Sequence, residues 1–154
     1  MYFLEFVMDP LSVMASVVGL LAGAGKVATV LRKLKTSVVD APVSIGLLLF
    51  QIEDISNCLS AVKLLLLEIN SAPKRRVSMV QVDHLVATLT EAVLTFSELE
   101  AVIIPLKDIN VSAVSTIQRL KWAWEEENMA NIMTRLDRHK SSLSLILNIL
   151  QWCV

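Results

Sequence analysis

The sequence predicts an all-α fold: a single bundle of about five helices in which the first helix is largely central. Two observations support this prediction. The 154 residues contain only four glycines and four prolines, so few positions interrupt regular structure. Apolar residues recur at steps of three and four over long segments, and strand-like alternation is absent. Long helices joined by short connections favour antiparallel neighbours in a bundle.

The first predicted helix runs from about Asp9 to Val39. Asp9 can cap its N-terminus, and Pro10 suits the first helical position. Residues 10–25 contain no charge, and a basic group then follows, formed by Lys26, Arg32, Lys33 and Lys35. A helix with almost no polar face is typical of the centre of a bundle or of a lipid bilayer.

The remaining helices follow from the same spacing. After a turn at 40–42, the second helix has the most regular apolar series: Ile45, Leu49, Ile52, Ile55, Leu59, Val62, Leu66 and Ile69. Residues 70–78 form a connection with the basic cluster Lys74, Arg75 and Arg76. The third helix has the apolar series Val82, Leu85, Leu89, Val93, Phe96, Leu99 and Ile103, and Pro105 helps to end it. A shorter helix is expected around 117–124, and the last begins near Glu125–Glu127 and continues to about Leu150.

Composition excludes several classes of protein. Hydrophobic residues make up 55% of the chain and charged residues 19%, which predicts wide apolar faces in one domain. The net charge of -1 gives no electrostatic basis for binding nucleic acid. Two cysteines do not form a disulfide framework, so we expect a reduced, cytoplasmic setting. Ala22–Ala24 resembles a signal-peptide cleavage site, but the acidic Glu5 and Asp9 precede it where basic residues are expected. The uncharged run at 10–25 is also shorter than the roughly 20 residues of a permanent span.

No catalytic, metal or cofactor site is predicted. His84 and His139 have no partner at ligand spacing, and the glycines do not form a phosphate-binding loop. No serine lies in the strand-to-helix turn of a nucleophile elbow. His139 falls on the apolar side of the last helix, where a core histidine bonded to a neighbour is expected. We therefore expect that the protein is not an enzyme and uses no cofactor.

Ala15, Gly19 and Gly23 recur at every fourth position of the first helix. Small residues at this spacing let another helix approach closely, although each interior glycine costs about 1 kcal/mol relative to alanine. One explanation is a thin central helix in a crowded bundle. The other adds a second state, in which the helix leaves the bundle, self-associates through these positions and inserts into a membrane. The residues predicted to contact lipid are then Val17, Val18, Leu20 and Leu21. The residues predicted to contact anionic headgroups are Lys26, Arg32, Lys33 and Lys35, with Lys74, Arg75 and Arg76 as a lesser candidate cluster.

Four segments resemble a known family: "MDPLSVMASVVGLLAGAGKV", "VDHLVATLTEAVLTFSELEAVI", "RLKWAW" and "HKSSLSLILNILQ". Over residues 8–153 the chain resembles the fungal N-terminal domain of STAND proteins, which is similar to the HeLo and HeLo-like helical bundles. The resemblance implies an effector domain of NOD-like signalling in programmed cell death or heterokaryon incompatibility. In such domains, oligomerisation driven by a STAND NTPase or ankyrin-repeat sensor releases the N-terminal helix. That helix targets and permeabilises the plasma membrane.

Residues 1–7, with Tyr2, Phe3 and Phe6, precede the resemblance and form an N-terminal extension. Relatives usually continue beyond the position of Val154, so we expect either an excised domain or a solitary form of the effector.

The alternative function is an adaptor that signals through homotypic bundle contacts and has no membrane activity.

Overall fold

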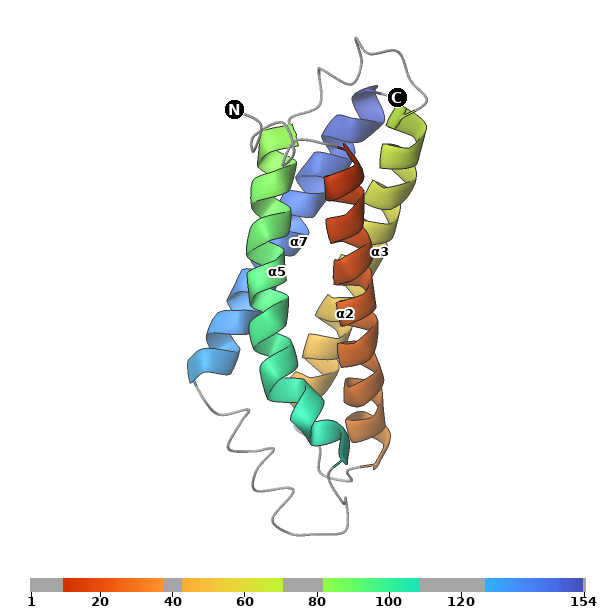
Figure 1. Ribbon diagram of the computed structural model, residues 1–154. Coiled ribbons are helices and arrows are strands. Elements are labelled where there is room, and N and C mark those ends of the chain that lie inside the picture. Colours follow the sequence, from red (N-terminus) through yellow and green to blue (C-terminus); the bar gives the residue numbers. More distant parts are fainter. Residues whose placement is uncertain (1–9, 38–42, 71–81, 109–126, 154) are drawn as a thin grey trace.

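The computed structural model describes residues 10–37, 43–70, 82–108 and 127–153 (Figure 1). These residues form the four α-helices α2 (Pro10–Ser37), α3 (Val43–Asn70), α5 (Val82–Ile103) and α7 (Glu127–Cys153). A 3-10 helix, η1 (Ile104–Asp108), continues directly from α5 and contains Pro105. The described residues contain no strand, which confirms the prediction of an all-α bundle.

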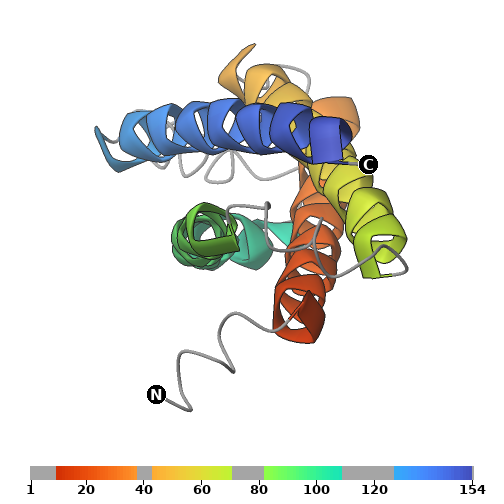
Figure 2. The same cartoon turned by 90° about the horizontal axis from the view of Figure 1, so that it is seen from above.

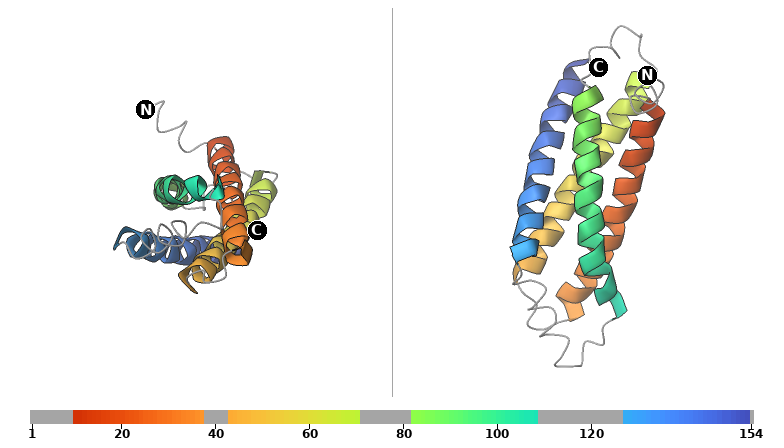
Figure 3. Two further views of the ribbon diagram at one scale, coloured as in Figure 1. Left: turned by 90° about the horizontal axis from the view of Figure 1, so that it is seen from below. Right: turned by 60° about the vertical axis from the view of Figure 1, so that its left-hand side comes forward.

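Successive helices run in opposite directions along the bundle (Figure 1). α2 packs against α3 and α5, and α7 packs against the same two helices from the other side (Figure 2). α2 and α7 therefore occupy opposite corners, as do α3 and α5 (Figure 3). In this arrangement the α2–α3 and α5–α7 neighbours are antiparallel, whereas the α2–α5 and α3–α7 neighbours are parallel.

The first helix is at a corner of the bundle, so the prediction that it is largely central is wrong for the described residues. Four helices of similar length share the core, and each turns one face inward. Up to Gly25, the outward face of α2 consists largely of small residues, exposed at Ala15, Gly19, Ala22 and Gly25. Small side chains expose little apolar area, so this face does not need to be covered. The low polarity of the α2 sequence therefore did not mean that this helix lies at the centre of the bundle.

The core contains the apolar positions that the helical spacing predicts. In α3, each side chain of the predicted series from Ile45 to Leu66 is buried, and in α7 the buried series includes Met129, Ile132, Leu136, Leu143 and Ile146. One predicted core position in α5 is wrong. Val93 is 41% exposed, and Ala92 takes the neighbouring inward position.

The predicted bounds agree closely with the helices. α5 begins and ends at the first and last residues of the apolar series predicted for the third helix, and the first and last expected helices correspond to α2 and α7. The N-terminal extension 1–7, the connection 71–78 with Lys74, Arg75 and Arg76, and the short helix expected at 117–124 lie outside the described residues.

Candidate functional site

The predicted helix-association residues occupy different environments along α2. Ala15 and Gly19 are exposed, and a Cβ built at Gly19 meets nothing within 4 Å. Gly23 is buried, and a Cβ there would lie 2.5 Å from the Glu100 carboxylate oxygen Oε1. In the folded bundle, Gly23 therefore accommodates the side chain of Glu100, and only Ala15 and Gly19 of the predicted series are accessible to another molecule.

Gly19 and Gly23 border a hollow between α2 and α5, which we call the α2–α5 groove. Its volume is about 270 Å³, and Val93, Phe96 and Glu100 form much of its α5 side. Because glycine has no side chain, α2 and α5 can approach each other at these positions, and the space beside the two glycines stays unfilled. The groove explains the exposure of Val93, which faces the space rather than the core.

The predicted lipid-contact residues divide between core and surface. Val17 and Leu20 are buried in the bundle core, at 0% and 4% exposure. Val18 is 46% exposed, and Leu21 is partly buried against the core. Val17 and Leu20 can therefore contact lipid only if α2 leaves its neighbours, whereas Val18 is accessible in the folded bundle.

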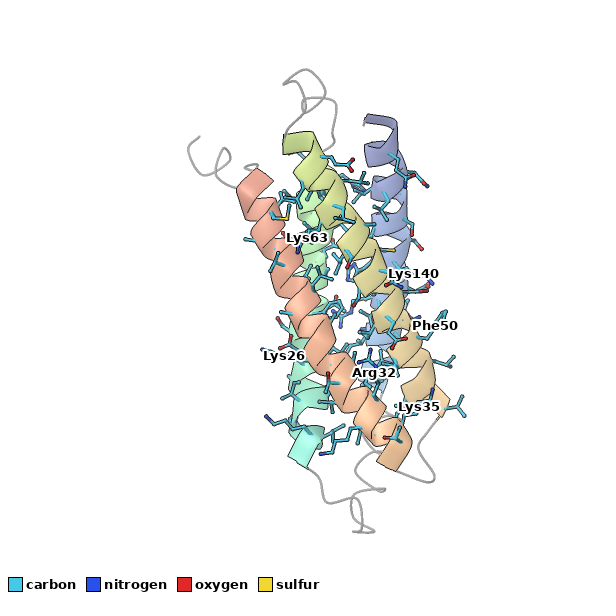
Figure 4. The ribbon with its side chains drawn as sticks, turned by 90° about the vertical axis from the view of Figure 1, so that its right-hand side faces the viewer. Lys26, Arg32, Lys35, Phe50, Lys63 and Lys140 are labelled. Carbon is cyan, nitrogen blue, oxygen red and sulfur yellow. The ribbon has the colours of Figure 1, made fainter. Side chains whose placement is uncertain are left out.

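The predicted headgroup residues of α2 lie on two sides of the helix (Figure 4). On the α3 side, Arg32 Nη2 donates to Glu53 Oε1 at 3.0 Å, and Lys35 lies beside Gly46. On the α5 side, Lys33 Nζ donates to the backbone oxygen of Lys107 at 2.7 Å, and exposed Lys26 lies about two turns nearer the N-terminus of α2. The four cations consequently do not form one patch.

Lys26 and Lys33 line a second hollow of about 530 Å³, which we call the lysine hollow. Lys107 of η1 is its third lysine, Val30 and Ile104 supply apolar wall, and Glu100 separates it from the α2–α5 groove. Sequence reasoning missed Lys107, Ile104 and Glu100. No spacing in the sequence links them to α2, because the parallel packing of α2 and α5 brings them together.

A buried polar contact joins α5 to α7. His139 Nε2 lies 2.8 Å from Thr95 Oγ1, and both residues are buried. Thr95 Oγ1 also donates to the backbone oxygen of Glu91 at 3.0 Å, so the single hydroxyl hydrogen assigns the donor role in the first bond to His139 Nε2–H. This confirms the prediction of a core histidine bonded to a neighbour.

The environment of His139 lowers the pKa of its imidazole. Burial is the main cause, and the nearby positive charges of Arg135 and Arg138 act in the same direction, while Glu91 opposes them. Beside it, Arg135 donates two hydrogen bonds to the carboxylate of Glu98, one of them at 3.1 Å. The hydrogen bond from Arg135 lowers the pKa of Glu98. Among the described residues, no group of three or more His, Cys, Asp or Glu side chains is arranged to hold a metal ion.

Two of the described helices are long and apolar enough to cross a membrane. The segments are Val13–Thr36 of α2, with 24 residues, and Val43–Glu68 of α3, with 26 residues. The core helices of water-soluble bundles have the same length and composition. The second segment was missed at the sequence level because its few charges, such as Glu53 and Asp54, interrupt the apolar run.

Comparison of the chain with models of known protein families, with curated proteins and with solved structures gives no match. The resemblance to the fungal STAND N-terminal domain therefore remains a prediction from the sequence segments quoted above.

Proposed function

We propose that this chain is a non-enzymatic effector domain of fungal NOD-like signalling, and that oligomerisation triggers its insertion into the plasma membrane. The observation on which the proposal depends is the character of α2. It is long and apolar enough to cross a bilayer, it occupies a corner of the bundle, and its basic residues follow its apolar part. The resemblance to the STAND N-terminal domain supports the same function.

For the side chains of α2 themselves, such a transition costs little. Side chains such as Val17, Leu20 and Leu31, which are buried in the bundle, would exchange one apolar environment for another on entering lipid. At 1.5 Å per residue, the 19 residues 13–31 that precede Arg32 are about 28 Å long, which is close to a hydrocarbon core of about 30 Å. Lys26 is the one charge between Val13 and Thr29, and its side chain can extend toward the interface. Arg32, Lys33 and Lys35 would then remain at the cytoplasmic surface, near anionic headgroups.

Dye release from anionic liposomes tests the proposal. The full chain, a version starting at Met8 and a version lacking residues 1–35 are compared, with and without forced oligomerisation through a fused dimeriser. We expect leakage from the first two versions and none from the third. Absence of leakage from every version after forced oligomerisation would reject membrane permeabilisation.

Gly19→Leu sharpens this test. A Cβ at Gly19 meets nothing within 4 Å, so a larger side chain starts in the open space of the α2–α5 groove. It nevertheless blocks close approach of a second α2 helix in the inserted state. We expect Gly19→Leu to abolish leakage while the circular dichroism spectrum and the thermal midpoint are retained. Asn57→Leu, on the exposed side of α3, serves as a control for added surface hydrophobicity.

A second candidate function is a homotypic adaptor without membrane activity. It is favoured by exposed apolar side chains on the N-terminal half of α3, where Val43, Leu47 and Phe50 are 82%, 55% and 60% exposed. These three residues lie at steps of four and three, so they share one outward side of the helix, and Figure 4 shows Phe50 directed away from the bundle. An adaptor predicts that Leu47→Glu with Phe50→Glu abolishes self-association and that Gly19→Leu has no effect. An effector predicts loss of leakage from Gly19→Leu.

A further inference from the structure

We propose that the lysine hollow between α2 and η1 binds an acidic phospholipid through its phosphate headgroup, before α2 leaves the bundle. The inference deepens the proposed membrane function, because it names the lipid class and the site that recognises it in the folded state. Its components are three cations at the rim, an apolar wall and a volume of about 530 Å³. That volume lies within the range of about 300 to 1,000 Å³ that is typical of ligand sites.

The charges at the hollow favour an anion. Lys26 and Lys33 come from α2, and Lys107 comes from η1, so the site exists only while α2 is packed on α5. Glu100 is the single described acidic side chain that lines it, which leaves a net positive charge. A phosphomonoester has a charge of about -1.5 to -2 near neutral pH and three acceptor oxygens, which matches several ammonium donors.

One of these lysines is already positioned. Lys33 Nζ donates to the backbone oxygen of Lys107 at 2.7 Å, which fixes the ammonium group at the rim between α2 and η1. An ammonium group has three donors, so two remain for a ligand. Lys107 is exposed, lines the hollow and adds its charge from η1.

The apolar wall distinguishes a lipid from free phosphate. Both Val30 and Ile104 line the hollow beside the lysines; Ile104 is only partly buried and presents aliphatic surface, whereas Val30, at 6% exposure, adds little. A free phosphate ion would contact only the cations. A phospholipid would also place the first part of its acyl or glycerol region on Val30 and Ile104, and this apolar contact adds affinity. The geometry therefore favours an anionic amphiphile.

The test uses the full chain and dihexanoyl phosphatidic acid below its critical micelle concentration, with binding followed by calorimetry and amide chemical shifts. Dihexanoyl phosphatidylcholine and inorganic phosphate are the comparison ligands. We expect phosphatidic acid to bind more tightly than either one, with shift changes concentrated in the last turns of α2 and in η1. Lys107→Gln keeps the backbone oxygen that Lys33 uses and should weaken binding about fivefold, the contribution expected of one basic residue at an anionic surface. Lys63→Gln on α3, away from the hollow (Figure 4), should leave binding unchanged.

The outcomes separate this inference from the proposed function. Equal affinity for Lys107→Gln, Lys26→Gln and the unmodified chain would overturn the site, even if the chain releases dye from liposomes. Binding of phosphate as tight as that of phosphatidic acid would overturn the role of the apolar wall, and equal binding of phosphatidylcholine would overturn charge recognition. Specific lipid binding without dye release would instead support the site and reject permeabilisation.

Discussion

α5 contacts two neighbours in very different ways. Toward α7 it has a buried hydrogen bond between Thr95 and His139, and Glu98 accepts two bonds from Arg135. Toward α2 it faces Gly19 and a space of about 270 Å³, with the lysine hollow beyond it. Directional polar contacts fix the register of α7 on α5. α2 instead meets α5 across a partly unfilled space, and its basic side chains donate to Glu53 of α3 and to the backbone oxygen of Lys107 in η1. The contact of α5 with α2 is therefore less completely filled than its contact with α7, and release of α2 as an effector would begin at this contact.

The largest expected effect tests whether α2 separates alone. Leu31 is fully buried, so Leu31→Ala should lower the free energy of unfolding by about 2–5 kcal/mol. Urea unfolding measures the loss, and hydrogen exchange locates it. If α2 separates from the bundle on its own, Leu31→Ala should increase the hydrogen-exchange rates of the α2 amides more than those of the α7 amides. Val18→Ala, at an exposed position of the same helix, is the control, and a uniform gain across all four described helices would contradict the comparison.

The α5–α7 contact can be weakened by a single atom change. Thr95→Val removes the acceptor of His139 Nε2–H and keeps the shape of the side chain, so a buried donor loses its partner. We expect a loss of about 1–3 kcal/mol in the free energy of unfolding. Thr90→Val is a matched control, because the Thr90 hydroxyl is exposed and bonds only to the backbone oxygen of Val86 in the described contacts. Equal losses for the two variants would show that the buried bond contributes nothing particular.

The same contact predicts a dependence on pH. Because the pKa of His139 in the folded chain is below its usual value of 6.5, the unfolded chain binds more protons once the pH falls below about 6.5. The stabilising contribution of the neutral imidazole is therefore complete above that pH and is lost as the pH falls toward the lowered pKa. Urea unfolding between pH 7.5 and pH 5 should show a decreasing midpoint. His139→Gln, which keeps an N–H donor but does not titrate, should reduce this slope, and an unchanged slope would assign it to other groups.

The smallest expected effect compares two glycines of α2. Gly19→Ala meets open space and should raise the free energy of unfolding by about 1 kcal/mol, the difference in helix propensity. Gly23→Ala requires the carboxylate of Glu100 to move from a position 2.5 Å away, so its gain should be smaller or negative. Thermal unfolding of both variants measures the difference. Equal gains would mean that Glu100 moves freely and that Gly23 has no packing role in the bundle.

The sequence by itself determined the helices and most of the core. Steps of three and four placed residues such as Ile45 and Leu66 inside and indicated the extent of α5, because a helix turns the same face inward along its whole length. The packing of α7 was predictable to the level of a buried His139. The sequence did not indicate the partner of His139. Thr95 belongs to another helix, and its place in the sequence does not distinguish it from an exposed threonine such as Thr90.

The tertiary structure alone decided which helices became neighbours. The corner position of α2, its parallel pairing with α5 and the meeting of Lys33 with Lys107 depend on how four similar apolar faces share one core. Apolar attraction has no direction, so the sequence pattern specifies that a face is buried but not against which helix. The position of each helix is set by side-chain fit, and here Gly19 and Gly23 border an unfilled space between α2 and α5.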